Sequence, residues 1–202
     1  MSQTAEPDRP LRADARRNRE RILAAAKQLL AEAGADAQMD DIARRAGVGV
    51  GTLYRHFPTK DELLGALLKQ KFVELKARAE RHLELDDPWE GLTGMLRESA
   101  LAMEHDVGEQ RVLWQLTAES FAIAQPAHQE LTEVGERLVA RAHAAGVLRR
   151  DFEAAHIPTM MCGIGAAIAA QELPGPAGHG WRDVLEFLLA GLRAPGADAP
   201  TG

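Results

Sequence analysis

The chain has 202 residues, which is enough to bury a hydrophobic core in one or two compact units. Its single cysteine, Cys162, excludes an intramolecular disulfide, and a reducing cytoplasm is therefore the expected compartment. No apolar run is long enough for a membrane helix and the N-terminus lacks a signal-peptide pattern, so we expect no membrane partner.

Charge is distributed unevenly along the chain. Residues 1–60 have 11 Lys and Arg against 8 Asp and Glu, while residues 61–202 have 13 against 22, within a total net charge of −6. A mildly basic first part on an acidic body is typical of a protein whose N-terminal part meets a polyanion.

A first helix is predicted from Arg16 onward. Its apolar face contains Ile22, Ala26, Leu29 and Ala33. Gly34 follows and is a typical left-handed helix cap. Residues 1–14 are polar, contain proline and lack periodicity, which predicts a disordered tail.

Two short helices are predicted next, over residues 39–46 and 50–57. Gly47 is expected to end the first, and Pro58 forbids continuation of the second. A fourth helix is predicted to begin at Thr59, whose hydroxyl can cap the amide of Glu62, and to run to about residue 81.

Further helical segments are predicted near residues 89–105, 109–124, 127–145, 153–172 and 181–193. Pro126, Gly146 and the proline-containing stretch 174–180 separate them. No window alternates apolar and polar residues with period two, so no strand is predicted. The expected fold is all-α, with a three-helix helix-turn-helix domain over residues 15–60. A larger helical body follows over residues 61–194, and a disordered tail over 195–202.

The helix predicted over residues 50–57 has one apolar and one polar face. Leu53 and Phe57 share the apolar face, so the opposite face is free to meet a partner. A short helix that is held from behind and flanked by phosphate-binding groups is typical of DNA recognition. Arg55 is the side chain on the free face best able to read guanine O6 and N7. No nucleophile, base and orienting group converge in this stretch, so a catalytic centre is not expected.

The same residues resemble the N-terminal DNA-binding domain of the TetR family of bacterial transcriptional regulators. The resemblance covers roughly residues 17–68. It is carried by RILAAA at 21–26, DIA at 41–43, AGV at 46–48, GTLYRHF at 51–57 and KDELL at 60–64.

The resemblance implies which of these residues contact bases and which contact phosphate groups. Contacts with bases or the groove fall to Val50, Gly51, Thr52 and Arg55. Phosphate contacts fall to Tyr54, His56 and Lys60, with Gln38 in place of the threonine that often opens the family's second helix. Arg17 is a further phosphate candidate, although a solvated face shared with Asp14 and Glu20 explains it equally well.

The resemblance also implies that the body over 61–194 forms a dimer and binds a small molecule. In the family, the last two long helices of each subunit make the homodimer interface. The residues that fit this role are Gly163, Ala166, Ala170, Trp181, Leu185, Leu188 and Leu192. Ligand-pocket candidates are Met103, Trp114, Thr117, Phe121 and Met160, although core packing explains each of them as well.

No cofactor is expected, and the histidines lack the spacing of a metal site. Cys162 lies in an apolar run, which favours a buried, inert thiol. The family resemblance implies a homodimeric repressor that an unknown small-molecule effector releases from a palindromic operator in double-stranded DNA. The alternatives are a DNA-binding regulator without a small ligand, an activator, and a helical-bundle enzyme.

Overall fold

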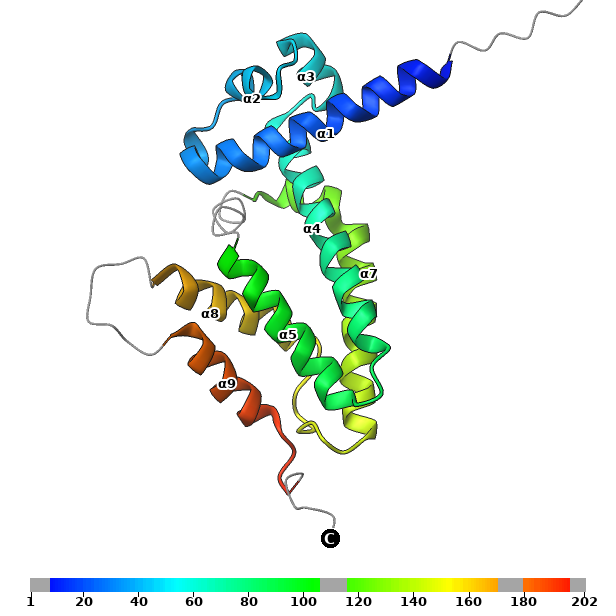
Figure 1. Ribbon diagram of the computed structural model, residues 1–202, viewed down its shortest axis with the longest axis vertical. Helices are drawn as coiled ribbons and strands as arrows, with labels where there is room; N and C mark the ends of the chain where they lie inside the picture. Colours follow the sequence, from blue (N-terminus) through cyan, green and yellow to red (C-terminus); the bar gives the residue numbers. More distant parts are fainter. Residues whose placement is uncertain (1–7, 106–115, 171–179, 197–202) are drawn as a thin grey trace, which may run out of the picture. The chain divides into compact units, whose positions relative to one another are not determined.

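The first three helices end where the glycines and proline of the sequence predict. The computed structural model describes residues 8–105, 116–170 and 180–196, and it places α1 at Asp8–Ala33, α2 at Met39–Ala46 and α3 at Val50–His56 (Figure 1). A short 3-10 helix, Gly34–Asp36, follows α1. Both Gly34 and Gly47 have positive φ, at 59° and 63°, a conformation that favours glycine.

Helix α1 begins earlier than the sequence pattern predicts. Residues 8–14, which we expected in a disordered tail, form its first two turns, while residues 1–7 lie outside the described residues. Pro10 is tolerated because the first turn of a helix needs no amide donor. Ion pairs between Arg17 and Asp14 and between Arg16 and Glu20 support the solvated part of the helix.

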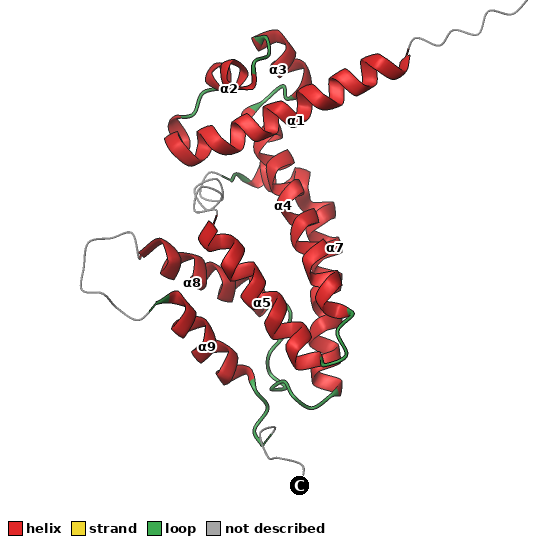
Figure 2. Ribbon diagram, in the orientation of Figure 1, coloured by secondary structure: helices red, strands yellow, loops and turns green. Residues whose placement is uncertain are grey.

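The remaining described elements are also helices (Figure 2). They are α4 at Lys60–Leu83, α5 at Pro88–His105, α7 at Ala118–Ala144, α8 at His156–Ala170 and α9 at Trp181–Leu192. Within the described ranges the only β pairing is an isolated bridge between Leu148 and Arg193, which confirms the all-α expectation. None of these helices has the length and apolar character needed to cross a bilayer.

Helix α7 continues through Pro126, where we expected a break between two helices. Proline has no amide to donate to the carbonyl of Ala122, an interruption that costs a helix about 3 kcal/mol. Ala124 and Ala127, on either side of it, are both buried in the protein. Tertiary packing of the two flanking turns therefore outweighs the local preference.

The chain divides into two units, each with its own hydrophobic core. Unit 1 contains the chain up to Leu68 together with residues 116–124, and unit 2 contains the other described residues. The division lies within α4 and α7, whereas the sequence pattern placed a domain boundary between residues 60 and 61. The largest fully buried side chains of unit 1 are Ile22, Leu30, Ile42, Leu53 and Leu63. Those of unit 2 are Leu92, Leu96, Leu138, Leu148, Ile164, Trp181 and Leu189.

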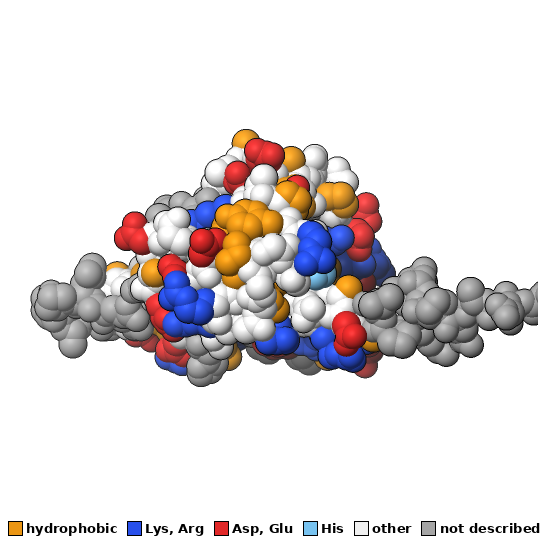
Figure 3. All heavy atoms as spheres, turned by 90° about the horizontal axis from the view of Figure 1, so that it is seen from above, with side chains coloured by type: hydrophobic (Ala, Val, Ile, Leu, Met, Phe, Trp, Pro, Cys, Tyr) orange, Lys and Arg blue, Asp and Glu red, His pale blue; other side chains and the backbone are white. Residues whose placement is uncertain are grey.

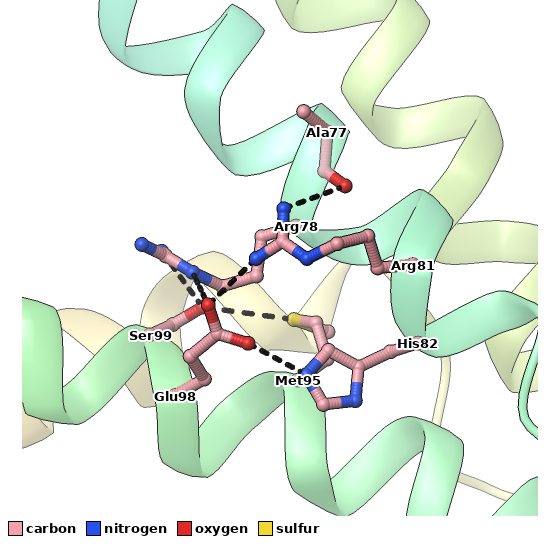
Figure 4. A network of polar contacts seen from close by, with 7 residues as sticks. All are labelled: Ala77, Arg78, Arg81, His82, Met95, Glu98 and Ser99. Atoms are coloured by element: carbon pink, nitrogen blue, oxygen red, sulfur yellow. Dashed lines mark hydrogen bonds and ion pairs between the residues drawn. The ribbon is translucent and has the colours of Figure 1, made fainter.

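A polar network joins α4 to α5 inside unit 2 (Figure 4). The carboxylate of Glu98 accepts hydrogen bonds from Arg78 Nε at 3.0 Å and Arg81 Nη2 at 2.7 Å, and its other oxygen lies 2.8 Å from His82 Nε2. The hydrogen bond with His82, followed by the bond and charge of Arg78, lowers the pKa of Glu98 below its ordinary value. Gly94 makes room for the imidazole, because a Cβ there would lie 2.9 Å from His82 Cε1.

Candidate nucleic-acid interface

The turn between α2 and α3 is built around Gly47. Its amide donates to the carbonyl of Arg44 at 3.1 Å, and the amide of Val48 reaches back to the carbonyl of Ala43 at 3.0 Å. These bonds satisfy the last carbonyls of α2 and end it. Gly49 then precedes α3 with extended backbone, and its carbonyl accepts the amides of Thr52 and Leu53 at 2.8 and 3.1 Å.

Helix α1 holds this turn from behind. Arg21 Nη2 donates to the carbonyl oxygen of Gly47 at 3.0 Å, and the guanidinium of Arg19 lies 5.0 Å from the centre of the Phe57 ring. Arg45 of α2 pairs with Glu32 of α1 at 2.7 Å, and this hydrogen bond lowers the pKa of the Glu32 carboxyl. Helix α1 therefore contacts the turn itself, the end of α3 and the end of α2.

The side of α3 opposite Leu53 and Phe57, its outer face, is exposed to solvent. Leu53 and Phe57 are 0% and 2% exposed, whereas Val50 and Tyr54 are 43% and 44% exposed. Gly51 and Arg55 are also exposed, and Thr52 is half-buried. In the face drawn in Figure 3, hydrophobic side chains lie near the middle, with basic and acidic side chains around them. The geometry brings together all four residues expected to face bases.

Arg55 folds back along its own helix. Its Nε donates to the carbonyl oxygen of Gly51 at 3.1 Å, and its Nη2 lies 3.4 Å from Thr52 Oγ1. Both contacts involve residues on the same outer face, so the guanidinium is held over the start of α3. An arginine restrained in this way loses less side-chain entropy when it meets a base.

Three of the residues expected to bind phosphate make polar contacts within the chain. Lys60 Nζ donates to the carbonyl oxygen of Ala37 at 3.0 Å, and Gln38 Nε2 donates to that of Asp36 at 3.0 Å. Tyr54 is exposed and His56 is half-buried. Arg17 is exposed at the surface of α1 and pairs with Asp14.

The start of α2 lacks a side-chain cap. Gln38 occupies the N-cap position with an extended backbone but makes no capping hydrogen bond, and neither aspartate of the first turn takes its place. Asp41 instead pairs with Arg44 at 2.5 Å. The uncapped amides favour an anion, while the charges of Asp40 and Asp41 oppose it.

A shallow groove of about 340 Å³ lies between α1 and α2, which the sequence pattern did not reveal. Its lining consists of Arg21, Ala24, Ala25, Gln28, Arg45, Ala46 and Gly47. The two arginines already contact Gly47 and Glu32, so the groove has an alanine floor and a rim of engaged guanidinium groups.

Four of the five ligand-pocket candidates lie among the described residues, two in each unit. Met103 and Met160 pack against the core of unit 2, while Thr117 and Phe121 belong to unit 1. Phe121 is 40% exposed, and Trp114 lies outside the described residues. Thr117 caps α7, because its Oγ1 accepts the amide of Ser120 at 3.1 Å. The helical spacing of residues 114, 117 and 121, which suggested a pocket wall, does not reveal this capping role of Thr117.

The candidates for the dimer interface separate into two sets. Gly163, Ala166, Ala170 and Leu188 are exposed, as expected. Trp181, Leu185 and Leu192 are instead buried in the core of unit 2, and Trp181 Nε1 donates to Glu104 at 3.0 Å. Because these three side chains pack inside the subunit, they offer little exposed surface to a second copy. Val184 and Phe187 are also exposed on α9, at 38% and 74%.

Cys162 also differs from expectation, because it is exposed on α8 rather than buried. In the part of the chain that the structure describes, no three His, Cys, Asp or Glu side chains form a group that could hold a metal ion.

Comparison with known proteins gives two family matches. The model described as "Bacterial regulatory proteins, tetR family" matches residues 22–67, which include α2, α3 and the start of α4. The model described as "Transcriptional regulator SbtR-like, C-terminal domain" matches residues 87–194, more than half of the chain.

The chain is also similar to individual regulators. The transcriptional repressor KstR of Rhodococcus jostii is 36% identical over 129 residues, which cover 61% of this chain and 58% of the relative. The chain thus spans less than two thirds of that relative's length. A TetR transcription regulatory protein from Mycobacterium vanbaalenii has a solved structure with a TM-score of 0.61, at 30% identity and coverage of 92% of this chain and 100% of that one. The regulator FadR from Bacillus halodurans, at 17% identity, shares the fold with a TM-score of 0.71, covering 93% of this chain and 95% of its own.

Proposed function

Because the chain belongs to the TetR family of bacterial regulatory proteins, we propose that it is a homodimeric repressor that a small molecule releases from a palindromic operator. The outer face of α3 is the observation that carries the proposal. It combines an arginine held over the helix start with exposed Val50, Gly51 and Tyr54. Such a face suits a DNA major groove, where arginine reads guanine and apolar groups contact the thymine methyl.

The recognition helix offers few groups that distinguish bases. Arg55 is its one bidentate donor, Thr52 is half-buried, and Val50 and Gly51 provide apolar contact and close backbone approach. Specificity in this proposal therefore rests on one or two base pairs read by Arg55, on methyl contacts, and on DNA shape. Tyr54, His56, Lys60, Gln38 and Arg17 supply phosphate contacts that fix the register.

The homodimer in this proposal uses the exposed faces of α8 and α9. On α8 the exposed residues after Pro158 are Thr159, Cys162, Gly163, Ala166, Ala169 and Ala170, all of them small. On α9, Val184, Phe187 and Leu188 are exposed hydrophobic side chains. A helix of small residues beside one with large apolar groups suits close packing against a second copy. Two subunits then place their α3 helices at half-sites separated by one or more turns of DNA.

Selection from random DNA duplexes tests the DNA-binding part. The full-length protein is expected to enrich a palindromic sequence, with affinity that falls as salt concentration rises because phosphate contacts release counterions. Enrichment of no sequence at low salt would contradict the proposal. Enrichment of a single, non-repeated half-site would contradict the homodimeric arrangement.

The effector-release part needs its own experiment. Thermal unfolding is measured against a panel of metabolites and drugs, since a ligand that binds the folded state stabilises it by RT ln(1 + [L]/Kd). Every stabilising compound is then tested for release of the selected duplex. Compounds that stabilise the protein and displace DNA support the proposal. If no compound does both, the second candidate function, a DNA-binding regulator without a small ligand, is favoured.

Transcription of a reporter downstream of the selected duplex distinguishes a repressor from an activator. We expect expression of the protein to lower reporter output when the duplex overlaps the promoter. An increase in output would support the activator reading instead.

A further inference from the structure

The N-terminal end of α7 belongs to the same unit as the recognition helix. Residues 116–124 cluster with the chain up to Leu68, although the family match for the DNA-binding domain ends at residue 67. Leu116 packs against the hydrophobic core formed by α1, α2, α3 and the start of α4. Folding of unit 1 therefore uses a segment that is remote in sequence from its helix-turn-helix.

Thr117 makes the polar contact between this segment and α4. Its hydroxyl donates to Asp61 Oδ1 at 2.6 Å, a charge-assisted hydrogen bond to the first turn of α4. The same oxygen accepts the amide of Ser120 at 3.1 Å, and the Ser120 hydroxyl accepts the amide of Thr117 at 2.8 Å. Ser120 is fully buried, and its Oγ also lies 3.3 Å from Thr117 Oγ1, so the contact of the Thr117 hydroxyl with the charged Asp61 is the shorter of the two.

One turn further along α4, Gly65 brings the two helices into direct contact. A Cβ at this position would lie 2.8 Å from both Ile123 Cβ and the carbonyl oxygen of Ser120. Asp61 and Gly65 are four residues apart and therefore share one face of α4. The Thr117 hydrogen bond and the Gly65 contact together fix both the rotation and the separation of the two helices within unit 1.

The first turn of α4 also carries Lys60, which contacts the loop before α2. Lys60 Nζ donates to Ala37, and Leu63 and Leu64 are buried in the core of unit 1. The orientation of this turn thus decides where Lys60 and the start of α2 lie relative to α3. We propose that Thr117, through its hydrogen bond to Asp61, is a positioning residue for the DNA-binding surface. This inference rests on the proposed function as a DNA-binding protein.

The expected size of the effect follows from the population of the binding-competent arrangement. Apparent Kd equals the intrinsic Kd divided by the competent fraction, so loss of the Thr117 bond weakens DNA binding by the amount that this fraction falls. A net hydrogen-bond contribution of the usual size corresponds to roughly a three- to tenfold increase in Kd.

A double-mutant cycle in the full-length protein tests the inference, with the duplex selected by the wild-type protein as the probe. Thr117→Val should raise the Kd for this duplex by roughly three- to tenfold. Thr117→Ser keeps the hydroxyl and should bind like the wild type. In an Asp61→Ala background, Thr117→Val should have no further effect, and the change in charge at position 61 cancels in the cycle.

Two outcomes overturn the inference. One is a folded Thr117→Val protein that binds the duplex as tightly as the wild type. The other is an equal loss in both backgrounds, which would show that Thr117 acts through the cap of α7 alone. If Thr117→Val does not fold, Thr117→Asp keeps a capping oxygen, repels Asp61 and tests the same contact. Failure of the wild-type protein to select any duplex is a distinct result, because it contradicts the proposed function itself.

Discussion

Arg21 and Gly47 are joined by a hydrogen bond of 3.0 Å from the guanidinium Nη2 to the backbone carbonyl oxygen, across 26 residues of sequence. This bond ties the exposed side of α1 to the turn that leads into α3. Gly47 accepts it with φ at 63°, a left-handed conformation that L-residues with a side chain rarely adopt. Gly47 therefore has two structural roles: its left-handed conformation allows the turn, and its carbonyl oxygen holds the Arg21 side chain.

Gly47→Ala should lower the free energy of unfolding by about 1–3 kcal/mol. The added Cβ is strained at positive φ and would lie 2.6 Å from Arg21 Nη2, so the guanidinium must also shift from its position at the Gly47 carbonyl. Urea unfolding followed by circular dichroism measures the change. Gly51→Ala is the matched control, because nothing lies within 4 Å of a Cβ there and alanine favours a helix. An equally stable Gly47→Ala protein would contradict the importance of this turn geometry.

Arg55→Ala should relax the preference for a single base pair in each half-site, at a cost of about 1–3 kcal/mol in binding the preferred duplex. The reason is that Arg55, held by Gly51 and Thr52, is the one bidentate donor on the outer face of α3. Binding to duplexes that vary one base pair at a time measures this effect.

Lys60→Ala should differ from Arg55→Ala in its effect on sequence preference, because a phosphate contact carries no sequence information. This variant should weaken binding to all duplexes about equally and reduce the slope of log K against log salt by about one. If Arg55→Ala gives this uniform pattern instead, the guanidinium binds phosphate rather than a base.

The short helices of unit 1 could be predicted from sequence because local chemistry decides their ends. Gly47 and Pro58 limit α2 and α3, and the amide of Glu62 donates to Thr59 Oγ1 at 3.1 Å, as the predicted cap requires. The outer face of α3 could also be predicted, since the buried Leu53 and Phe57 leave only the opposite side of the helix for a partner.

Contacts between distant parts of the chain could not be predicted in the same way. The membership of Thr117 in unit 1 depends on Asp61 and Gly65, which no local pattern connects to it. Helix α9 is apolar on two sides, so periodicity alone could not tell that Trp181 and Leu185 face the core while Phe187 faces outward. The continuity of α7 through Pro126 is likewise a result of tertiary packing.

Glu98→Gln should lower the free energy of unfolding at neutral pH by about 1 kcal/mol, a modest value because the Glu98 side chain is 41% exposed. The variant leaves the charge of Arg78, which is only 16% exposed, without its carboxylate.

The pH dependence of this loss has a definite sign. Hydrogen bonding to His82 and Arg78 lowers the pKa of Glu98 below the ordinary value of 4.5 in the folded state. The carboxylate therefore stabilises the fold fully above that value, and the contribution is lost as pH falls through the lowered pKa. The difference between wild type and Glu98→Gln should shrink as pH drops below 4.5. A difference that is constant across this range, or that also appears with the exposed Glu133→Gln, would contradict the assignment.

Phe187→Glu should convert the proposed dimer into monomers, raising its dissociation constant roughly a hundredfold or more because two apolar side chains are lost per dimer. Phe187 is 74% exposed on α9, beside exposed Val184 and Leu188, so a subunit alone gives it little cover. Sedimentation velocity over a range of concentrations measures the change. Val73→Glu is the matched control, since this valine is 52% exposed on α4, away from α8 and α9 in sequence. A Phe187→Glu protein that remains dimeric, or a Val73→Glu protein that dissociates equally, would show that the subunits meet through a different surface.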